Sequence, residues 1–231
     1  MPASFDLTLQ GEPLRLLADR AVHWPSAQTL IVADLHWGKA AAFRAESVAV
    51  PPGTTSTDVD RLSRLLHETG AQHLTVLGDL FHARTSLAAE TLATLRDWRA
   101  RWPDVSLTLI RGNHDRHAGD PPTDLGFQCV EAPYPAGPFA LTHHPADADA
   151  YVLAGHVHPG VRLRGRGAQR LTLPCFAIGR TRMLLPAFGS FTGLGVIDPA
   201  EFHRIIVVAE SDLIEVPTGT ARTRDCPSVY L

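Results

Sequence analysis

The segment TLIVADLH at residues 29–36 joins a short apolar run to two polar side chains. An apolar run of this length, rich in aliphatic residues, predicts a buried strand over Thr29–Ala33. Two later segments have the same pattern of an apolar run followed by polar residues. His73–Leu77 precedes Gly-Asp, and Val105–Ile110 precedes, after one arginine, Gly-Asn-His-Asp. The sequence therefore predicts three buried strands, each followed closely by polar residues.

Helical patterns fill the gaps between these strands. A first helix is predicted over Thr57–Thr69, with Ser56 or Thr57 as its N-cap and Gly70 as its end. A second is predicted over Ser86–Trp102, where a following proline ends it. The order strand, helix, strand, helix, strand is typical of a layered α/β domain.

The rest of the chain reads mainly as short strands. A hairpin is predicted before the first buried strand, from Leu14–Leu17 and Ala21–Trp24. The strands predicted after residue 120 are Phe127–Val130, Phe139–Thr142, Tyr151–Ala154, Val161–Leu163, Leu171–Ile178 and Ile205–Ala209. We expect a single domain over residues 1–231, whose mostly β second half packs on the first, with a loose tail over the last dozen residues.

Composition excludes several classes of protein. The chain has 231 residues, 45% of them hydrophobic, and a formal net charge of −3. It has neither a long uncharged apolar run nor a basic-then-apolar start, so we expect a cytoplasmic protein without a membrane partner. Its three cysteines, Cys129, Cys175 and Cys226, are far apart and predict reduced thiols rather than a disulfide framework or a zinc site.

Five polar clusters each follow a predicted strand. They are Asp34-Leu-His36, Gly78-Asp-Leu-Phe-His82, Gly112-Asn-His-Asp115, His143-His-Pro145 and Gly155-His-Val-His-Pro159. The strands of an α/β sheet end together, so these clusters are expected to converge at one edge of the sheet. Taken singly, each is more often a surface turn or loop; five in order at strand ends favour a functional site.

Oxygen and imidazole donors without thiolates suit Mn, Fe or Zn. Residues spaced i and i+2 on an extended segment point to the same side, which predicts a common target for Asp34 with His36 and for His156 with His158. The candidate ligands are Asp34, His36, Asp79, Asn113, His143, His156 and His158. Seven donors fit two ions, with Asp79 as the bridge. His143 is preferred to His144 because it directly follows its strand.

These clusters, in this order, resemble the signature of the calcineurin-like metallophosphoesterase superfamily. The resemblance implies a two-sheet αββα sandwich and two ions, one held by Asp34, His36, Asp79 and His158 and the other by Asp79, Asn113, His143 and His156. It also implies that His114 is a non-ligand histidine next to the scissile phosphate. The second cluster ends in His82, as in the nuclease branch of the superfamily; the alternative is a histidine that only hydrogen-bonds near the site.

A closer resemblance is to the bacterial ligase-associated DNA-damage-response endonucleases of the PdeM type. It rests on Asp34-Leu-His-Trp-Gly-Lys39, on Phe43-Arg44 and on later segments such as Leu173-Pro-Cys-Phe176. This resemblance implies a Mn²⁺-dependent phosphodiesterase that acts on DNA. It also implies that a DNA ligase and a helicase-like repair protein are partners.

The expected reaction is an in-line attack on phosphorus by a hydroxide shared between two ions. His114 would protonate the leaving alkoxide or stabilise its charge. Asp115 would either orient His114 or cap a following turn. The catalytic residues expected are thus His114, His82 and Asp115.

Substrate contacts are expected from basic residues near the clusters. Lys39 and Arg44 follow the first cluster, and Arg162 and Arg164 begin an arginine stripe after the last one. The stripe would follow a phosphate backbone; the alternative for all four is a solvated face. Trp37 would stack on a base or pack in the core.

We expect a Mn²⁺-dependent endonuclease that acts on single-stranded DNA in DNA repair. Only 73 residues follow His158, which predicts no capping domain and an open site for a flexible strand. A second hypothesis is a phosphodiesterase or phosphatase that acts on a small phosphoester such as a cyclic nucleotide. A third is a non-catalytic scaffold of the same fold.

Overall fold

A mixed sheet of seven strands forms the first half of the computed structural model, which describes residues 3–50, 53–164 and 169–218. Its strands are β1 (Ser4–Leu9), β2 (Glu12–Leu17), β3 (Ala21–Trp24), β4 (Thr29–Ala33), β5 (His73–Leu77), β6 (Ser106–Ile110) and β7 (Phe127–Val130). Neighbours in the sheet follow the order of the chain. Strands β1 to β4 pair antiparallel and β4 to β7 pair parallel. The side chains that follow β4, β5 and β6 therefore emerge at one edge.

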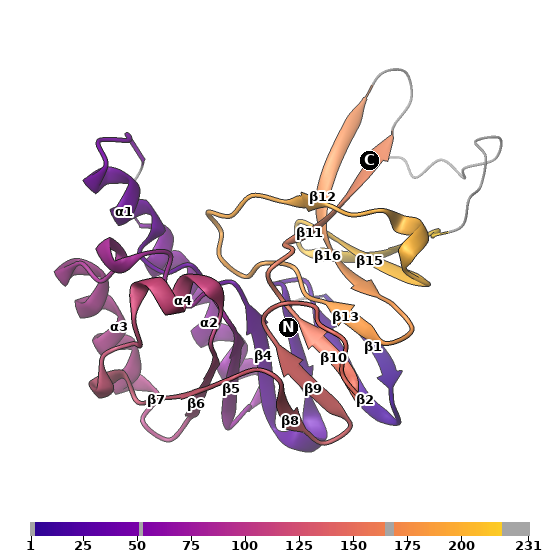
Figure 1. Cartoon of the computed structure of the whole chain (residues 1–231), viewed down its shortest axis with the longest axis horizontal. Coiled ribbons are helices and arrows are strands. Elements are labelled where there is room, and N and C mark those ends of the chain that lie inside the picture. Colours follow the sequence, from indigo (N-terminus) through magenta and orange to yellow (C-terminus); the bar gives the residue numbers. More distant parts are fainter. Residues whose placement is uncertain (1–2, 51–52, 165–168, 219–231) are drawn as a thin grey trace.

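Helices cover one face of this sheet (Figure 1). The α-helices are α1 (Lys39–Ala45), α2 (Thr54–Thr69), α3 (Ala89–Arg101) and α4 (Asn113–Ala118), and the 3₁₀ turns are η1 (Pro25–Ala27), η2 (Arg84–Ser86), η3 (Thr123–Leu125) and η4 (Pro199–Glu201). Alternate residues of β4 face opposite layers, as the pleat of a strand requires. Leu30 and Val32 pack with α2 residues, whereas Ile31 and Ala33 pack with the second sheet.

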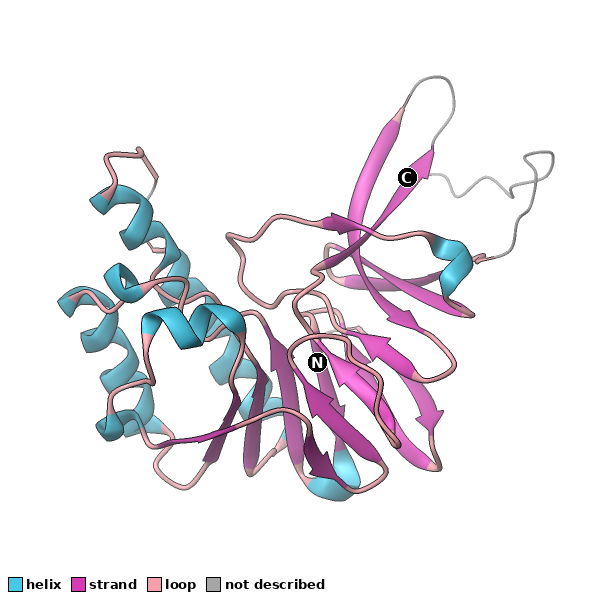
Figure 2. Ribbon diagram, viewed as in Figure 1, coloured by secondary structure: helices cyan, strands magenta, loops and turns pink. Residues whose placement is uncertain are grey.

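The second sheet lies against the first (Figure 2). Its strands are β8 (Tyr134–Ala136), β9 (Phe139–Thr142), β10 (Tyr151–Ala154), β11 (Pro159–Arg164), β12 (Arg170–Ile178), β13 (Arg182–Leu184), β14 (Gly195–Val196), β15 (Arg204–Ala209) and β16 (Asp212–Val216). Phe139, Leu153 and Phe176 of this sheet meet Ile31 and Leu77 of the first in a buried core. The predicted α/β sandwich of two sheets is confirmed. All four α-helices described precede residue 119, so the helical layer belongs to the first sheet.

Strands β9 and β10 pair in parallel and end at the same edge of the sandwich as β4, β5 and β6. All five polar clusters meet there. Within the described residues, the structure has no helix long and apolar enough to cross a membrane.

Two predicted helix starts are wrong. Helix α2 begins at Thr54 after Gly53, whose φ of 95° suits glycine, and the hydroxyls of Ser56 and Thr57 donate to the Gly53 carbonyl instead of capping the helix. Helix α3 begins at Ala89 rather than at Ser86, because Ser86 ends the turn η2.

Several elements carry no sequence prediction. Strands β1 and β16 complete hairpins with predicted strands; the short helix α1 follows the first cluster, and the short helix α4 begins within the third. The predicted loose tail, the last dozen residues, lies wholly outside the described residues.

Candidate metal centre and active site

The first group of donors comes from the ends of β4 and β10. Single ligand atoms of Asp34, His36 and His158 all lie within 4.8 Å of one another. The Nε2 atom of His158 is 3.4 Å from Asp34 Oδ1, and its Nδ1 is 3.2 Å from the carbonyl of Gly193. A carbonyl only accepts, so Nδ1 carries the proton and Nε2 presents its lone pair to the group.

The second group centres on His143, which follows β9. Its Nε2 atom lies 3.3 Å from Asp79 Oδ1, 3.0 Å from Asn113 Oδ1 and 3.1 Å from His156 Nδ1. Its Nδ1 donates to the carbonyl of Leu77 at 3.0 Å, which directs Nε2 into the group.

Asp79 joins the two groups. One carboxylate oxygen faces His143, and the other lies 3.8 Å from His36 Nε2. The structure thus brings all seven predicted donors together in two sets that share this carboxylate.

The donor set fits divalent cations. Both ring nitrogens of His36 are buried without a hydrogen-bond partner among the described residues, which is costly unless another group satisfies them. Burial lowers the pKa of His36 to about 2, so its ring is neutral and able to ligate at neutral pH. Burial opposes ionisation of Asp79, but the hydrogen bond and charge of His143 outweigh it and lower the Asp79 pKa to about 2. Carboxylate and imidazole donors in one buried cluster suit Mn, Fe or Zn, and a bound cation would take the place of the proton that His143 shares with Asp79.

His143 and His144 occupy different positions. His143 is fully buried between Asp79 and Asn113, whereas His144 is exposed and lies over the ring of His156, with centroids 3.9 Å apart. Ligand atoms of His143, His144 and His156 also lie within 4.8 Å of one another. The geometry favours His143 as the ligand shared with Asp79.

The spacing of the donors predicted an extended backbone, but at five of them the backbone is not extended. The φ angles are 54° at Asp34, 46° at His36, 53° at Asp79, 66° at His156 and 49° at His158. The left-handed conformation is uncommon for residues other than glycine, and it turns the chain sharply after each strand. These turns, and not the alternation of a strand, direct each pair of side chains to one point.

Two motif glycines leave room for ligand side chains. A Cβ at Gly78 would lie 2.2 Å from His143 Nδ1, and one at Gly112 would lie 2.3 Å from Asp79 Oδ1. Ligand side chains therefore approach the backbone so closely at these two positions that only glycine fits.

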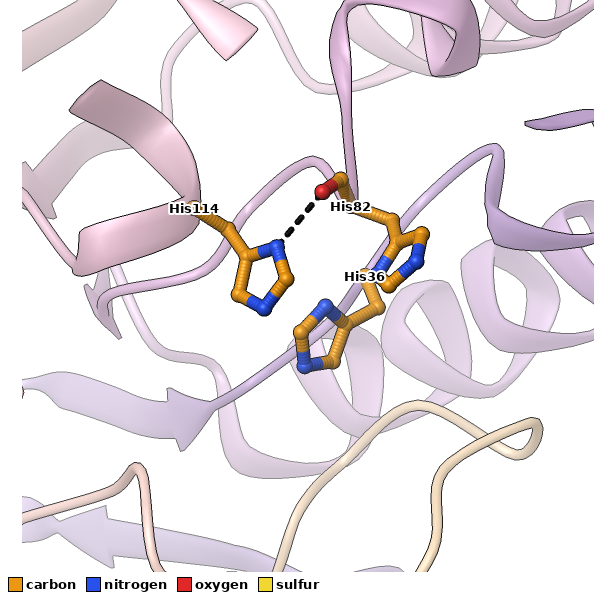
Figure 3. Close-up of side chains that lie close together, drawn as sticks. All are labelled: His36, His82 and His114. Carbon is orange, nitrogen blue, oxygen red and sulfur yellow. Dashed lines mark hydrogen bonds between the residues drawn. The ribbon is translucent and has the colours of Figure 1, made fainter. Parts of the chain in front are cut away.

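His114 and His82 stack beside the donors (Figure 3). Their ring centroids are 4.9 Å apart with the planes inclined by 26°, and the ring of His36 lies within 5.4 Å of both. His114 Nδ1 lies 2.6 Å from the carbonyl oxygen of His82, and its Nε2 lies 4.0 Å from Asp79 Oδ2. Burial, together with Lys39, lowers the pKa of His82 to about 4, so its ring is neutral at neutral pH.

Asp115 does not orient the ring of His114. Its buried carboxylate accepts hydrogen bonds from the backbone N–H groups of Asp79, Leu80 and Gly112 at 2.8, 2.9 and 2.8 Å. The expectation that it caps a turn is closer to the structure, because Asp115 closes the first turn of α4 and also ties it to the loop after β5. The Asp115 carboxylate is therefore engaged by the backbone of two ligand loops, which it positions.

The residues predicted to contact substrate lie at different distances from the donors. Lys39 opens α1, is half-buried, and acts electrostatically on Asp79 and on His36. Arg44 lies at the other end of α1, where its guanidinium is 4.0 Å from Glu90 of α3. Trp37 is 1% exposed and packs against Phe81 and other rings, so stacking on a base is wrong for it.

Arg162 and Arg164 lie on the exposed face of strand β11. Arg164 pairs with Arg170 across the β11–β12 hairpin, which projects from the body of the sandwich (Figure 1). The third arginine of the predicted stripe, Arg166, lies outside the described residues. Two arginines thus share one face of the hairpin that starts directly after His158.

The loop between β13 and β14 carries contacts that the sequence reading missed. The Gly193 carbonyl fixes the ring of His158, and the N–H of Ser190 donates to both carboxylate oxygens of the buried Asp58 at 3.1 Å. The available signal was the spacing of Gly189, Gly193 and Gly195 around one aromatic residue.

Residues 27–140 match the family model for calcineurin-like phosphoesterases. Among solved structures, the chain is similar to the Pseudomonas putida nuclease MPE, with 45% sequence identity and a TM-score of 0.82 over 91% of this chain and 100% of that one. It also matches Yfce, a phosphoesterase from E. coli, with 15% identity and a TM-score of 0.39 over 83% of this chain and 99% of that one. No curated protein matches the chain.

Proposed function

Because the chain belongs to the calcineurin-like phosphoesterase family, we propose that it is a two-metal, Mn²⁺-dependent endonuclease that cuts single-stranded DNA in DNA repair. The observation that carries the proposal is the convergence of seven oxygen and nitrogen donors in two groups, with Asp79 between them. The phosphoesterase activity itself follows from the family. DNA as the substrate is supported by the similarity to a nuclease and by the arginines on β11.

Each ion would be held by four side chains, and the two sets would share Asp79. Asp34, His36, Asp79 and His158 would hold one, and Asp79, Asn113, His143 and His156 the other. When bound, two such ions acidify a water molecule and neutralise the charge on the phosphoryl oxygens. The buried carboxylates and the carbonyls that fix His143 and His158 position these donors before any ion arrives.

His114 is the proposed catalytic acid. Its Nδ1 proton is held by a main-chain carbonyl, so the ring exchanges a proton with the site only at Nε2. That atom faces Asp79, at the junction of the two donor groups. His114 would donate a proton there to the oxygen that leaves phosphorus.

An assay of circular single-stranded DNA with Mn²⁺ tests the proposal, because a circle reports internal cuts only. We expect the wild type to linearise the circle and His114→Ala to lose most of that activity. The same variant should lose much less activity on bis-p-nitrophenyl phosphate, whose nitrophenolate leaves without a proton. Equal DNA cleavage by His114→Ala and the wild type would exclude His114 as the acid.

One observation favours a small phosphoester as a second candidate substrate. A cavity of about 360 Å³ borders Asn113, His143 and His144, with Arg111 and Arg116 at its wall. A small-ester enzyme would hydrolyse bis-p-nitrophenyl phosphate and a cyclic nucleotide but leave the DNA circle intact. A scaffold would bind no Mn²⁺ and hydrolyse none of them. Partnership with a DNA ligase and a helicase-like protein stays a prediction.

A further inference from the structure

Two phenylalanine rings form an aromatic pair beside the candidate metal centre. Phe43 lies on α1 and Phe191 in the loop between β13 and β14, with ring centroids 5.7 Å apart and planes inclined by 83°. Phe43 is half-buried, whereas Phe191 is 37% exposed. Phe191 therefore offers part of its ring to solvent while Phe43 supports it edge-on.

The aromatic pair contacts the histidines of the proposed active site through Phe43. The centroid of Phe43 is 5.6 Å from that of His82, and His82 stacks on His114. The ring of His82 therefore separates Phe43 from His114, the residue proposed to act at the scissile phosphate. Exposed apolar side chains occur elsewhere on the surface, but these two rings border the site itself.

A cation accompanies the rings. The Nζ atom of Lys39 lies 5.9 Å from the centroids of both Phe43 and Phe191. Aromatic faces beside a positive charge are the means by which proteins hold single strands, since bases stack on the rings and the cation neutralises the backbone.

The loop that carries Phe191 is fixed at both sides. Before Phe191, the buried Asp58 carboxylate holds the N–H of Ser190, and Arg61 donates to the carbonyl of Phe188. After Phe191, the carbonyl of Gly193 holds the ring of His158. The position of Phe191 is thus tied to a proposed metal ligand.

We propose that Phe191, supported by Phe43, is a stacking subsite for a nucleobase next to the scissile phosphate, with Lys39 on the phosphate. The inference rests on the proposed nuclease function and adds a requirement for bases, which a site that recognised only the backbone would lack. The occupant is a base of single-stranded DNA, because a base paired in a duplex keeps its faces covered by its neighbours.

Cleavage of two thymidine oligonucleotides by the Mn²⁺-loaded enzyme tests the subsite. One oligonucleotide carries bases throughout, and the other has a central tract of abasic tetrahydrofuran residues. Stacking on an aromatic side chain predicts that the wild type cuts the base-bearing tract about 5- to 150-fold faster in kcat/KM. Phe191→Leu should bring the two rates together by slowing only the base-bearing tract, and Phe191→Tyr, which keeps a ring, should restore the difference.

The abasic rate of each variant reports the state of the metal centre, because that tract needs no stacking. Phe5→Leu is the matched control, since Phe5 is a partly exposed ring on β1 that faces Arg204. The inference is overturned if Phe191→Leu slows both tracts equally, or if the wild type does not distinguish them. A wild type that hydrolyses bis-p-nitrophenyl phosphate but cuts neither oligonucleotide overturns the nuclease proposal, and the subsite with it.

Discussion

His114 Nδ1 and the main-chain carbonyl oxygen of His82 lie 2.6 Å apart. The ring of His114 is therefore oriented by a backbone atom, which a substitution of the His82 side chain does not remove. The side chain of His82 contributes a neutral ring that stacks on His114 and separates it from Phe43. The two histidines consequently have different expected sensitivities to substitution.

His82→Ala should be much milder than His114→Ala. The first keeps the carbonyl that fixes the acid, so we expect its DNA cleavage to fall less than about tenfold, whereas loss of the general acid in His114→Ala lowers DNA cleavage by about 10²- to 10⁴-fold. Steady-state kinetics of both variants on both substrates measure the difference. Equal losses in the two variants would show that the His82 side chain takes part in the chemistry.

Asp79→Ala should remove metal more completely than any other single ligand change. Asp79 places one carboxylate oxygen beside each donor group, 3.8 Å from His36 Nε2 and 3.3 Å from His143 Nε2. Metal analysis after dialysis against Mn²⁺ should find both ions lost from this variant but only one from His158→Ala. For the wild type, Mn²⁺ at about 100 times Kd should raise the free energy of unfolding by about 2.7 kcal/mol for each site, and EDTA should reverse this. The exposed Asp104→Ala is the control, and a full metal complement in Asp79→Ala would contradict the shared role.

Asp115→Ala should destabilise the fold by about 3 kcal/mol, because it leaves three buried N–H groups without their acceptor. Urea unfolding of the metal-free protein measures this without any contribution from bound ions. Asp60→Ala removes an exposed carboxylate from α2 and serves as the reference. If the two variants unfold at the same urea concentration, the carboxylate of Asp115 does not hold the loops together.

The arginines of β11 should contribute to DNA affinity in a salt-dependent way. If Arg162 and Arg164 each neutralise a phosphate, the double alanine variant should reduce the slope of log K against log salt by about 1.4, since each contact to a single strand contributes about 0.7. Fluorescence anisotropy with a labelled oligonucleotide in EDTA gives the slope. Arg96→Ala removes an exposed arginine that pairs with Asp124 on the helical side and should leave it unchanged; an unchanged slope in the double variant would exclude the contacts.

Glu12 should make the fold sensitive to acid. Its carboxylate accepts hydrogen bonds from Ser26 and Trp24, which lower its pKa in the folded state below the model-peptide value. The unfolded chain therefore binds the proton more tightly, and the stability supplied by ionised Glu12 is present above the unfolded pKa and lost as pH falls through the folded one. Urea titrations between neutral and acidic pH should show a smaller loss in Glu12→Gln than in the wild type. A parallel loss in both would contradict the assignment.

The parts of the fold that follow local patterns were predictable. Strands β4 and β5 match their predicted bounds, because a continuous apolar run bounded by polar residues has few alternatives in a layered fold. The seven candidate donors were expected to lie together because their clusters follow strands, and parallel strands end together. Their convergence then follows from topology.

The remaining features depend on contacts that local patterns do not contain. The positions of the aromatic residues depend on distant partners. Trp37 is buried against Phe81 and Trp98, whereas the exposed Phe191 lies on a loop that Asp58 holds. The role of Asp115 depends on backbone groups 35 and 36 residues away. The starts of α2 and α3 were misplaced because hydroxyl residues there bond to nearby backbone groups in another way.

The left-handed turns at Asp34, His36, Asp79, His156 and His158 have a consequence for the history of the chain. Each costs about 1 kcal/mol or more in a residue with a Cβ, and glycine would adopt the same turn almost freely. A lineage with no use for these side chains would gain stability by replacing them one at a time. The five strained residues at the rim of the sandwich therefore lower the stability of the polypeptide, a cost that only a use for their carboxylates and imidazoles would offset.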